Sequence, residues 1–497
     1  MDRAARAPLV ALAATSVVLL AVRLYASAHV GFGDSEALYA SYALHPTPAY
    51  VDHPGLVGAV ARAIGGGTAP SPAGAHLVTS ILATGFPWLL AAACRACGAD
   101  ARRSLLVALV AALVPEIAVG LFALTPDLLL ACAWTGALGL AALGLRSPAG
   151  RARASAAFAA AGVLAGVASA SKVTGLALFA ALAIAYASAP AAAHRRTLAP
   201  WAGLAAGAAV FEPVVAFEVR AGWPMLHHRL VDTQAAAGLS LRNLGAVVAG
   251  QLVYLSPVVA VLAVLAIRAA WRAPRADAVG RLLTAAFVVP LAGLLPLCLW
   301  SRVAEPHWLA PPLLALAMAA ARSTFAPSRR LYVASCATAA FAVAAVHAWV
   351  LVPSAILLAP ASSDAHLDIS NELYGWPAVA DAVRHEAAAE TATSGPEPPT
   401  LAVVGPHWVV CAQLEAALRG ALPVGCDTPV PDDFDTWLPR RRWERDDLLL
   451  WVDDGRFADA PRPAAFVPLR ARTVDVRRAG RVVRTFTITV LARRAQA

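Results

Sequence analysis

Long runs of apolar residues recur along the first 353 positions of the chain, with short polar segments between them. Each run is near twenty residues long, which is the length that an α-helix needs to cross the hydrocarbon core of a bilayer. We count eleven of them, at positions 8–26, 74–94, 104–123, 127–145, 154–170, 173–189, 199–217, 243–267, 282–300, 307–321 and 331–353. The pattern predicts a mainly α fold, in which residues 1–353 form a polytopic helical bundle embedded in a membrane.

Residues 354–497 follow a different pattern. Short strand-like runs appear at Leu401–Val404 and Leu448–Val452, and apolar residues alternate with threonine and arginine within Arg472–Leu491, on both sides of Ala479-Gly480. Alternation around such a turn is typical of a β-hairpin. The tail is therefore predicted to be a small α/β domain of about 130 residues outside the membrane.

Arginine is distributed unevenly over the segments that separate the apolar runs. With the N-terminus placed in the cytoplasm, the inside segments carry 17 Arg and the outside segments carry six Lys or Arg. This bias follows the positive-inside rule. It predicts a multi-pass membrane protein with a cytoplasmic N-terminus. Because eleven is an odd number of spans, residues 354–497 are predicted to lie outside the cytoplasm.

The composition agrees with a membrane protein. Apolar residues make up 59% of the chain, charged residues 14%, and the mean hydropathy is +0.64. These values exclude an ordinary soluble protein. The net charge of +9 arises mostly from the inside loops, so it does not indicate nucleic-acid binding.

In this topology the unusual polar residues gather at the outer membrane surface. Charged groups beside a bilayer are costly to desolvate, so they usually bind or react with something. The candidates are Asp34, Glu36, Asp52 and His53 in the first outer loop (27–73), Asp127 at the fourth span, Lys172 between spans five and six, and Arg302, Glu305 and His307 before span ten. Together they predict an outward-facing site in contact with the lipid bilayer.

Ordinary structural roles compete with this interpretation. Asp34 and Asp127 stand where helices begin, and aspartate is a good helix cap. Lys172 is the only lysine beside 39 arginines, and it is either a turn residue or a point charge suited to a phosphate oxygen. Asp52 and Asp127 could instead share a divalent cation with a substrate phosphate, which their spacing does not test.

Several of these motifs, taken in order, resemble one family. Asp34-Ser35-Glu36-Ala37-Leu38-Tyr39 followed by Tyr50-Val51-Asp52-His53-Pro54 is similar to the first periplasmic loop of the bacterial dolichyl-phosphate-mannose-protein mannosyltransferase-like family, which includes transferases of the aminoarabinose type. The likeness continues to the tail in a series of short motifs at positions 124–127, 170–174, 222–223, 251–257, 305–311, 371–376 and 434–437.

The resemblance implies a GT-C fold and an inverting transfer of a sugar from a polyprenyl-phosphate donor to a hydroxyl of a cell-envelope acceptor. It implies an acid of the first motif as the catalytic base, and metal or phosphate binding by acids such as Asp52 and Asp127. Substrate or phosphate contacts are expected from Tyr50, His53, Lys172, Arg302, Glu305 and His307. Ser35 occupies the place of the family's usual aspartate, so the base is left open between Asp34 and Glu36.

The residue types suit this chemistry. A carboxylate can take the proton of the attacking hydroxyl, and a lipid phosphate leaves as an anion that cations or a metal ion stabilise. Two other classes stay open: a polytopic transporter and a non-catalytic lipid-binding relative. A transporter would more naturally place its charges near the middle of the membrane.

Overall fold

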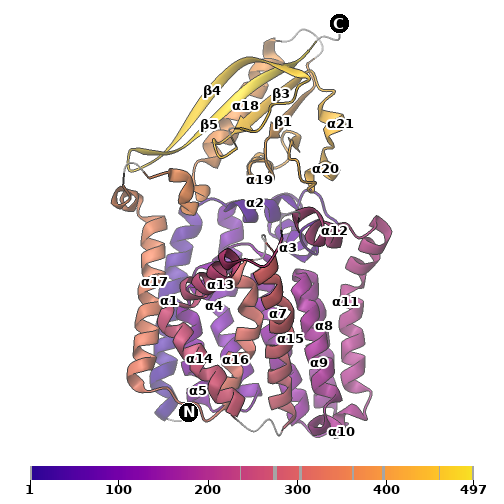
Figure 1. Ribbon diagram of the computed structural model, residues 1–497, viewed down its shortest axis with the longest axis vertical. Helices are drawn as coiled ribbons and strands as arrows, with labels where there is room; N and C mark the ends of the chain where they lie inside the picture. The colour runs from indigo at the N-terminus through magenta and orange to yellow at the C-terminus, as the bar shows by residue number, and fades with distance from the viewer. Residues whose placement is uncertain are drawn as a thin grey trace.

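A computed structural model describes residues 3–234, 237–272, 277–301, 305–360, 363–393, 398–457 and 459–494. Its lower part is a bundle of long apolar helices (Figure 1). Seven of the described helices are individually long and apolar enough to cross a membrane: α1 (Arg3–His29), α4 (Pro72–Ala96), α7 (Pro126–Arg146), α8 (Ala152–Ser171), α11 (Ala199–Ala221), α15 (Ala278–Trp300) and α17 (Arg329–Leu351). The protein is therefore a multi-pass membrane protein.

Three further apolar stretches are broken by sharp bends. They bend by 73°, 72° and 103°. The broken stretches are α5 (Ala101–Leu113) with α6 (Pro115–Ala118) and η1 (Gly120–Phe122), η2 (Val173–Gly175) and α9 (Leu176–Ala187) with η3 (Ala189–Ala191) and α10 (Ala192–Arg195), and α13 (Leu241–Leu255) with α14 (Pro257–Arg272). A proline lies at each break. Its ring and its missing N–H interrupt the helical hydrogen bonds, which explains why the helix bends there.

A buried arginine stabilises the end of α6, one turn after the break that follows α5. Arg23 of α1 donates to the carbonyl oxygens of Ile117 and Ala118 at 3.0 and 2.9 Å, and to the Thr84 hydroxyl at 3.0 Å. Carbonyl groups without helical partners are costly inside a membrane. The Arg23 side chain satisfies them and holds the end of this broken span in place.

Ten of the eleven predicted spans coincide with these helices and bent pairs. The remaining one, span ten at 307–321, is η5 (Pro306–Leu309) followed by α16 (Ala310–Arg322), whose 13 residues are fewer than a span needs. The described residues thus hold seven candidate spans, or up to ten when each bent pair counts as one. The short α16 lies within the bundle (Figure 1), and the N-terminus lies at the end of the bundle far from the C-terminal domain.

Small residues allow the helices to pack closely. Gly162 and Gly166 of α8 face Gly203 and Gly207 of α11, and a Cβ atom on Gly162 would lie only 1.8 Å from the Gly203 carbonyl oxygen. Close approach through small residues is a common way for membrane helices to associate. It draws α8, which ends at Lys172, tightly into the bundle.

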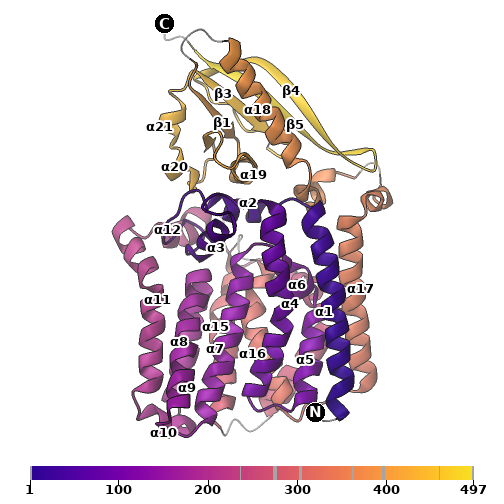
Figure 2. The same ribbon diagram turned by 180° about the vertical axis from the view of Figure 1, so that it is seen from behind.

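Short helices form a layer above the bundle. They are α2 (Asp34–Ser41), α3 (Leu56–Ile64), α12 (Pro224–Leu230) and η4 (Asp232–Gln234). Figures 1 and 2 both show α2, α3 and α12 between the bundle and the C-terminal domain. The first outer loop is therefore enclosed from above and below.

The C-terminal part is an α/β domain, as its alternating pattern predicts. Its five-stranded mixed sheet has the order β2-β1-β3-β5-β4, with β1 parallel to β2 and β3 and the long β4–β5 hairpin antiparallel. Its elements are η6 (Pro353–Leu358), η7 (Ala365–Leu367), η8 (Ile369–Leu373), α18 (Trp376–Thr393), β1 (Leu401–Gly405), α19 (Trp408–Leu418), β2 (Val424–Cys426), α20 (Phe434–Trp437), α21 (Arg440–Trp443), β3 (Leu448–Asp453), β4 (Phe466–Arg478) and β5 (Arg481–Arg493).

The first outer loop and this domain share one hydrophobic core. Ala37 and Tyr42 of the loop are buried in the same cluster as Val410 and Leu414 of α19 and Phe434 of α20. Burial of apolar surface is the main driving force for such association. The loop that carries the candidate acids is therefore packed as part of the C-terminal domain.

Candidate functional site

Four of the predicted site residues meet at the outer end of the bundle. Lys172, at the end of α8, places its Nζ 2.8 and 3.0 Å from the two carboxylate oxygens of Asp127, in the first turn of α7. His307 of η5 lies 3.5 Å from the same Nζ, and its Nδ1 lies 3.1 Å from a carboxylate oxygen of Glu305. The four residues form a compact network of alternating charge.

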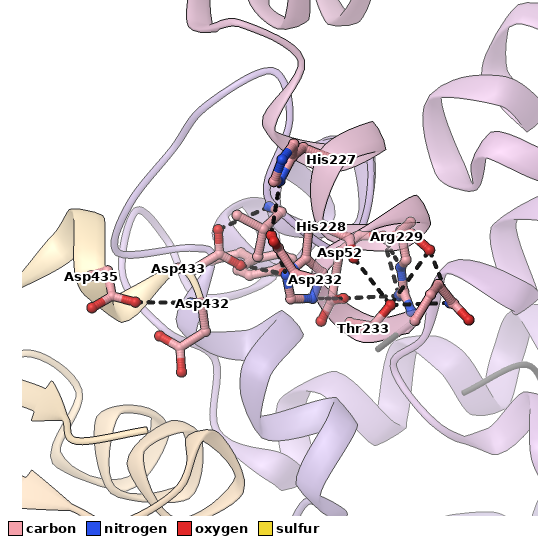
Figure 3. Close-up of polar contacts among 12 residues, drawn as sticks. Asp52, His227, His228, Arg229, Asp232, Thr233, Asp432, Asp433 and Asp435 are labelled. Atoms are coloured by element: carbon pink, nitrogen blue, oxygen red, sulfur yellow. Dashed lines mark hydrogen bonds and ion pairs between the residues drawn. The ribbon is translucent and has the colours of Figure 1, made fainter. Parts of the chain in front are cut away.

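A second ion pair involves Asp52. Its Oδ1 lies 3.0 Å from an Arg229 guanidinium nitrogen and 3.5 Å from His228 Nε2, both on α12 (Figure 3). Arg229 also donates to the Asp52 backbone carbonyl. Burial alone would raise the pKa of Asp52, but the hydrogen bond with His228 and the charge of Arg229 hold that pKa well below the ordinary value. Asp52 is therefore ionised at neutral pH.

Trp308 and His53 connect the two ion pairs. The Lys172 Nζ lies 5.5 Å and the Arg229 Cζ 5.9 Å from the centre of the Trp308 ring, which is within cation–π range. His53 is buried, and this burial, together with the charges of Arg229 and Lys172, lowers its pKa to about 3. His53 is thus neutral at physiological pH, and its ring packs edge-on against Tyr39 with centroids 5.4 Å apart.

Asp34 lies away from this cluster, in the contact with the C-terminal domain. Its Oδ2 accepts from Arg456 at 2.6 Å and its Oδ1 from Gln413 at 3.0 Å. The Asp34 backbone N–H donates to Oε2 of Glu372 at 3.4 Å. With its side chain only 8% exposed, Asp34 joins the first outer loop to the C-terminal domain.

Glu36 also makes several structural contacts. It sits in the first turn of α2, where its Oε2 accepts the Gly33 N–H at 3.1 Å in a capping box. Its Oε1 accepts the Leu124 N–H at 2.6 Å and lies 3.0 Å from His76 Nε2. Glu36 therefore links α2 to α4 and to the segment before α7.

The remaining predicted residues lie elsewhere. The Tyr50 hydroxyl donates to the carbonyl oxygens of Tyr42 and His45, and its ring stacks on Tyr42 with centroids 3.5 Å apart. These contacts shape the first outer loop. Arg302 lies outside the described residues.

An apolar cavity of about 1340 Å³ leads up to the network from within the bundle. Helices α5 and α16 contribute the largest shares of its walls, and Thr125, Asp127 and His307 line its polar end together with Glu116 and Tyr254. A long apolar space that ends at ionised groups suits an amphiphile with a charged head.

The geometry does not fit the predicted metal site. Asp52 and Asp127 each already have a cationic partner, in Arg229 and Lys172. Among the described residues, no three His, Cys, Asp or Glu side chains are grouped so that they could hold a metal ion. The predicted divalent cation stays a prediction.

Arg229, His228 and Trp308 were missed as site residues in the sequence analysis. Arginine is common in this chain, so Arg229 does not stand out as Lys172 does. The available signal was three consecutive basic or histidine residues, 227–229, in the outer segment between the predicted spans 199–217 and 243–267.

Comparisons with known proteins bear on the fold. No protein-family model and no curated protein sequence matches the chain. Among solved structures, the chain is similar over 97% of both chains to ArnT from Cupriavidus metallidurans bound to undecaprenyl phosphate, with a TM-score of 0.60 and 18% identity. The chain has the GT-C fold of ArnT.

A second solved structure supports the same fold at lower similarity. It is the oligosaccharyltransferase of Archaeoglobus fulgidus tethered with an acceptor peptide containing the NVT sequon. The match covers 90% of this chain and 69% of that chain, with a TM-score of 0.50 and 13% identity. The resemblance to ArnT spans both the bundle and the C-terminal domain.

Proposed function

We propose that this protein is an integral-membrane glycosyltransferase. It transfers a sugar from a polyprenyl-phosphate donor to a hydroxyl of a lipid, glycan or protein acceptor in the cell envelope, with inversion at the anomeric carbon. It acts in the bacterial inner membrane, with its N-terminus in the cytoplasm and its C-terminal domain in the periplasm. The arginine bias supports this orientation. The donor class is supported by the likeness of the fold to that of ArnT, whose structure contains bound undecaprenyl phosphate.

One observation carries the proposal: the apolar cavity ends at Asp127 and His307, which both contact Lys172. A polyprenyl chain is apolar along its whole length, and its phosphate is anionic. The cavity would hold the chain, while Lys172 and the nearby Arg229 would hold the phosphate. Charged donors in a site shielded from water stabilise a developing anion far more strongly than in bulk water.

The reaction follows from these positions. The acceptor oxygen forms a bond to the anomeric carbon, and the bond from that carbon to the phosphate oxygen breaks with its electron pair leaving on the phosphate. A carboxylate takes the hydroxyl proton. Lys172 and Arg229 stabilise the leaving phosphate, and His307 and His53 supply hydrogen bonds around it.

Three acids of the first outer loop can be considered as the base: Asp34, Glu36 and Asp52. The Asp34 and Glu36 side chains are 8% and 7% exposed and are hydrogen-bonded within the structure, whereas the Asp52 side chain is 23% exposed. Only Asp52 adjoins the cationic cluster that would hold the phosphate; its ion pair with Arg229 makes it a weaker base but fixes it beside the reacting bond. We therefore propose Asp52 as the base. Asp34 and Glu36 have structural roles, because their hydrogen bonds fix the first outer loop.

A non-catalytic lipid-binding role is the second candidate. It is favoured by Ser35, which stands where the resemblance expects an acid, and by the structural contacts of Asp34 and Glu36. Such a protein would bind a polyprenyl phosphate in the same cavity and leave the sugar bond intact.

A reconstitution experiment separates the two. The purified protein in lipid nanodiscs is mixed with polyprenyl-phosphate donors carrying radiolabelled sugars and with an envelope fraction. Transfer of label together with release of polyprenyl phosphate supports the transferase. Saturable donor binding without either product supports the lipid-binding role, and absence of donor binding contradicts both.

A further inference from the structure

Asp433 of the C-terminal domain contacts the first outer loop at the residue beside Asp52. Its Oδ1 accepts the Val51 N–H at 3.0 Å, and its Oδ2 accepts the Tyr42 hydroxyl at 3.1 Å. Asp433 is only 6% exposed, so both hydrogen bonds are shielded from water. Figure 3 shows its side chain close to His228 and Asp52.

The segment that receives this contact is a tight turn. The Tyr50 N–H donates to the His53 carbonyl oxygen at 2.9 Å, and the Gly55 N–H donates to that of Pro48 at 2.8 Å. Asp52 lies at the tip of the turn. A hydrogen bond to the amide next to it restricts the direction in which its carboxylate points.

The tip is held from two sides. From the membrane domain, Arg229 contacts both the carboxylate and the backbone carbonyl of Asp52. From the C-terminal domain, Asp433 contacts the preceding amide, that of Val51. We propose that Asp433 is a positioning residue, through which the docked C-terminal domain places Asp52 against Arg229 and His228.

The rest of the docking surface does not depend on Asp433. Trp437 of the C-terminal domain stacks on His45 of the first outer loop, with ring centroids 4.2 Å apart. Helices α2 and α19 also join the two parts through their shared hydrophobic core. A variant that loses the Asp433 carboxylate therefore keeps the domain docked and loses mainly the restraint on the turn. This separates a positioning role from a general contribution to folding.

Hydrogen–deuterium exchange of the full-length protein tests the proposal without any substrate. We expect the Val51 amide to exchange on the order of tenfold faster in Asp433→Ala, because its hydrogen-bond acceptor is removed. The increase is smaller in Asp433→Asn, whose amide oxygen still accepts. Asp435→Asn is the matched control, since Asp435 is exposed and caps only the Asp432 amide of its own segment.

The consequence for turnover rests on the proposed function. Asp433→Ala should lower kcat about tenfold, because a misplaced catalytic group loses rate, while the KM for the donor changes little. An unchanged Val51 exchange rate overturns the proposal, and so does faster exchange with unchanged kcat. If the exchange rate rises across the whole C-terminal domain in Asp433→Ala, Asp433→Leu decides, because leucine fills the space without an acceptor: an increase confined to the turn supports the proposal and no increase at Val51 overturns it.

The two proposals can fail separately. If the wild-type protein transfers no sugar to any acceptor, the proposed function fails. The exchange rate of Val51 then still decides whether Asp433 holds the turn.

Discussion

Lys172 Nζ lies 2.8 Å from Oδ1 of Asp127, although the two residues belong to different helices and are 45 positions apart. Lys172 is 5% exposed, and a buried ammonium without a counter-charge would be strongly destabilising. Asp127 therefore supplies the counter-charge for the single lysine of the chain, beside the end of the apolar cavity that Asp127 and His307 line. A donor phosphate arriving there would share this ammonium with Asp127.

The first prediction concerns this lysine. Lys172→Ala should reduce donor affinity or turnover on the order of tenfold to 100-fold, because the leaving phosphate loses a charged donor. Lys172→Arg should restore only part of the activity, since a planar fork replaces a compact point charge. Donor binding and single-turnover rates in nanodiscs measure both effects.

Arg220→Ala serves as the control for Lys172. Arg220 is an exposed basic residue near the outer end of α11 that donates to the Ala216 carbonyl oxygen. It should behave as wild type. Normal donor affinity and turnover in Lys172→Ala would return Lys172 to an ordinary structural role.

The second prediction separates the three acids of the first outer loop. Asp52→Asn should lower turnover by roughly 100- to 10,000-fold, which is the usual contribution of a general base. Asp34→Asn and Glu36→Gln should mainly lower the melting temperature, because each acid holds several hydrogen bonds between elements. Turnover per folded molecule and thermal unfolding are measured on the same preparations.

A different ranking would change the mechanism. Near-normal turnover in Asp52→Asn together with loss in Asp34→Asn, at equal stability, would move the base to the position that the sequence motif first indicated. Near-normal turnover in all three variants would exclude a carboxylate base in this loop.

The sequence predicts much of the site because polar residues stand out in an apolar chain. Asp127, Lys172 and His307 were identified in this way, and the structure brings them together. Asp34 could not be placed, because its partners Gln413 and Arg456 are 379 and 422 positions away. A motif shows which residue types are present but not which distant side chain neutralises them.

The sequence likewise predicts only part of the fold. Hydropathy alone locates the spans, since twenty apolar residues must be buried in lipid. It does not show that α13 and α14 meet at 103° or that Arg23 satisfies the carbonyl oxygens at the end of α6. Those features depend on prolines and on tertiary contacts made from other helices.

The third prediction concerns divalent metal ions. Because Arg229 and Lys172 already neutralise Asp52 and Asp127, we expect the protein to retain most of its turnover after dialysis against EDTA. The labelled-donor assay measures this directly. A loss of turnover that Mg²⁺ or Mn²⁺ restores would support the metal site that the sequence motifs suggested.

The fourth prediction concerns topology. Reporter fusions at Arg151 and Arg196 should read as cytoplasmic, and a fusion after Asp364 should read as periplasmic, because the arginine-rich loops mark the inner side. The N-terminus and the C-terminal domain lie at opposite ends of the bundle (Figure 2). A cytoplasmic reading after Asp364 would place the candidate site on the wrong face for an envelope acceptor.

The last prediction concerns pH and follows from the buried position of Asp433. Burial raises the pKa of Asp433 to about 7, and the charge of Asp52 adds to this, while the Val51 N–H, Tyr42 and His228 oppose it. A carboxyl group whose pKa is higher in the folded than in the unfolded protein stabilises the fold at low pH. That contribution is lost as the pH rises through the folded-state value. The melting temperature of the wild type should therefore fall relative to that of Asp433→Asn, by a few degrees, as the pH is raised from about 5 to about 8.

Burial also raises the pKa of the neighbouring Asp432 to about 7, but Asp432 is present in both proteins, so the difference between the two curves isolates Asp433. Parallel curves across this range would show that Asp433 does not titrate there, and that its hydrogen bonds to Val51 and Tyr42 keep the carboxylate ionised throughout.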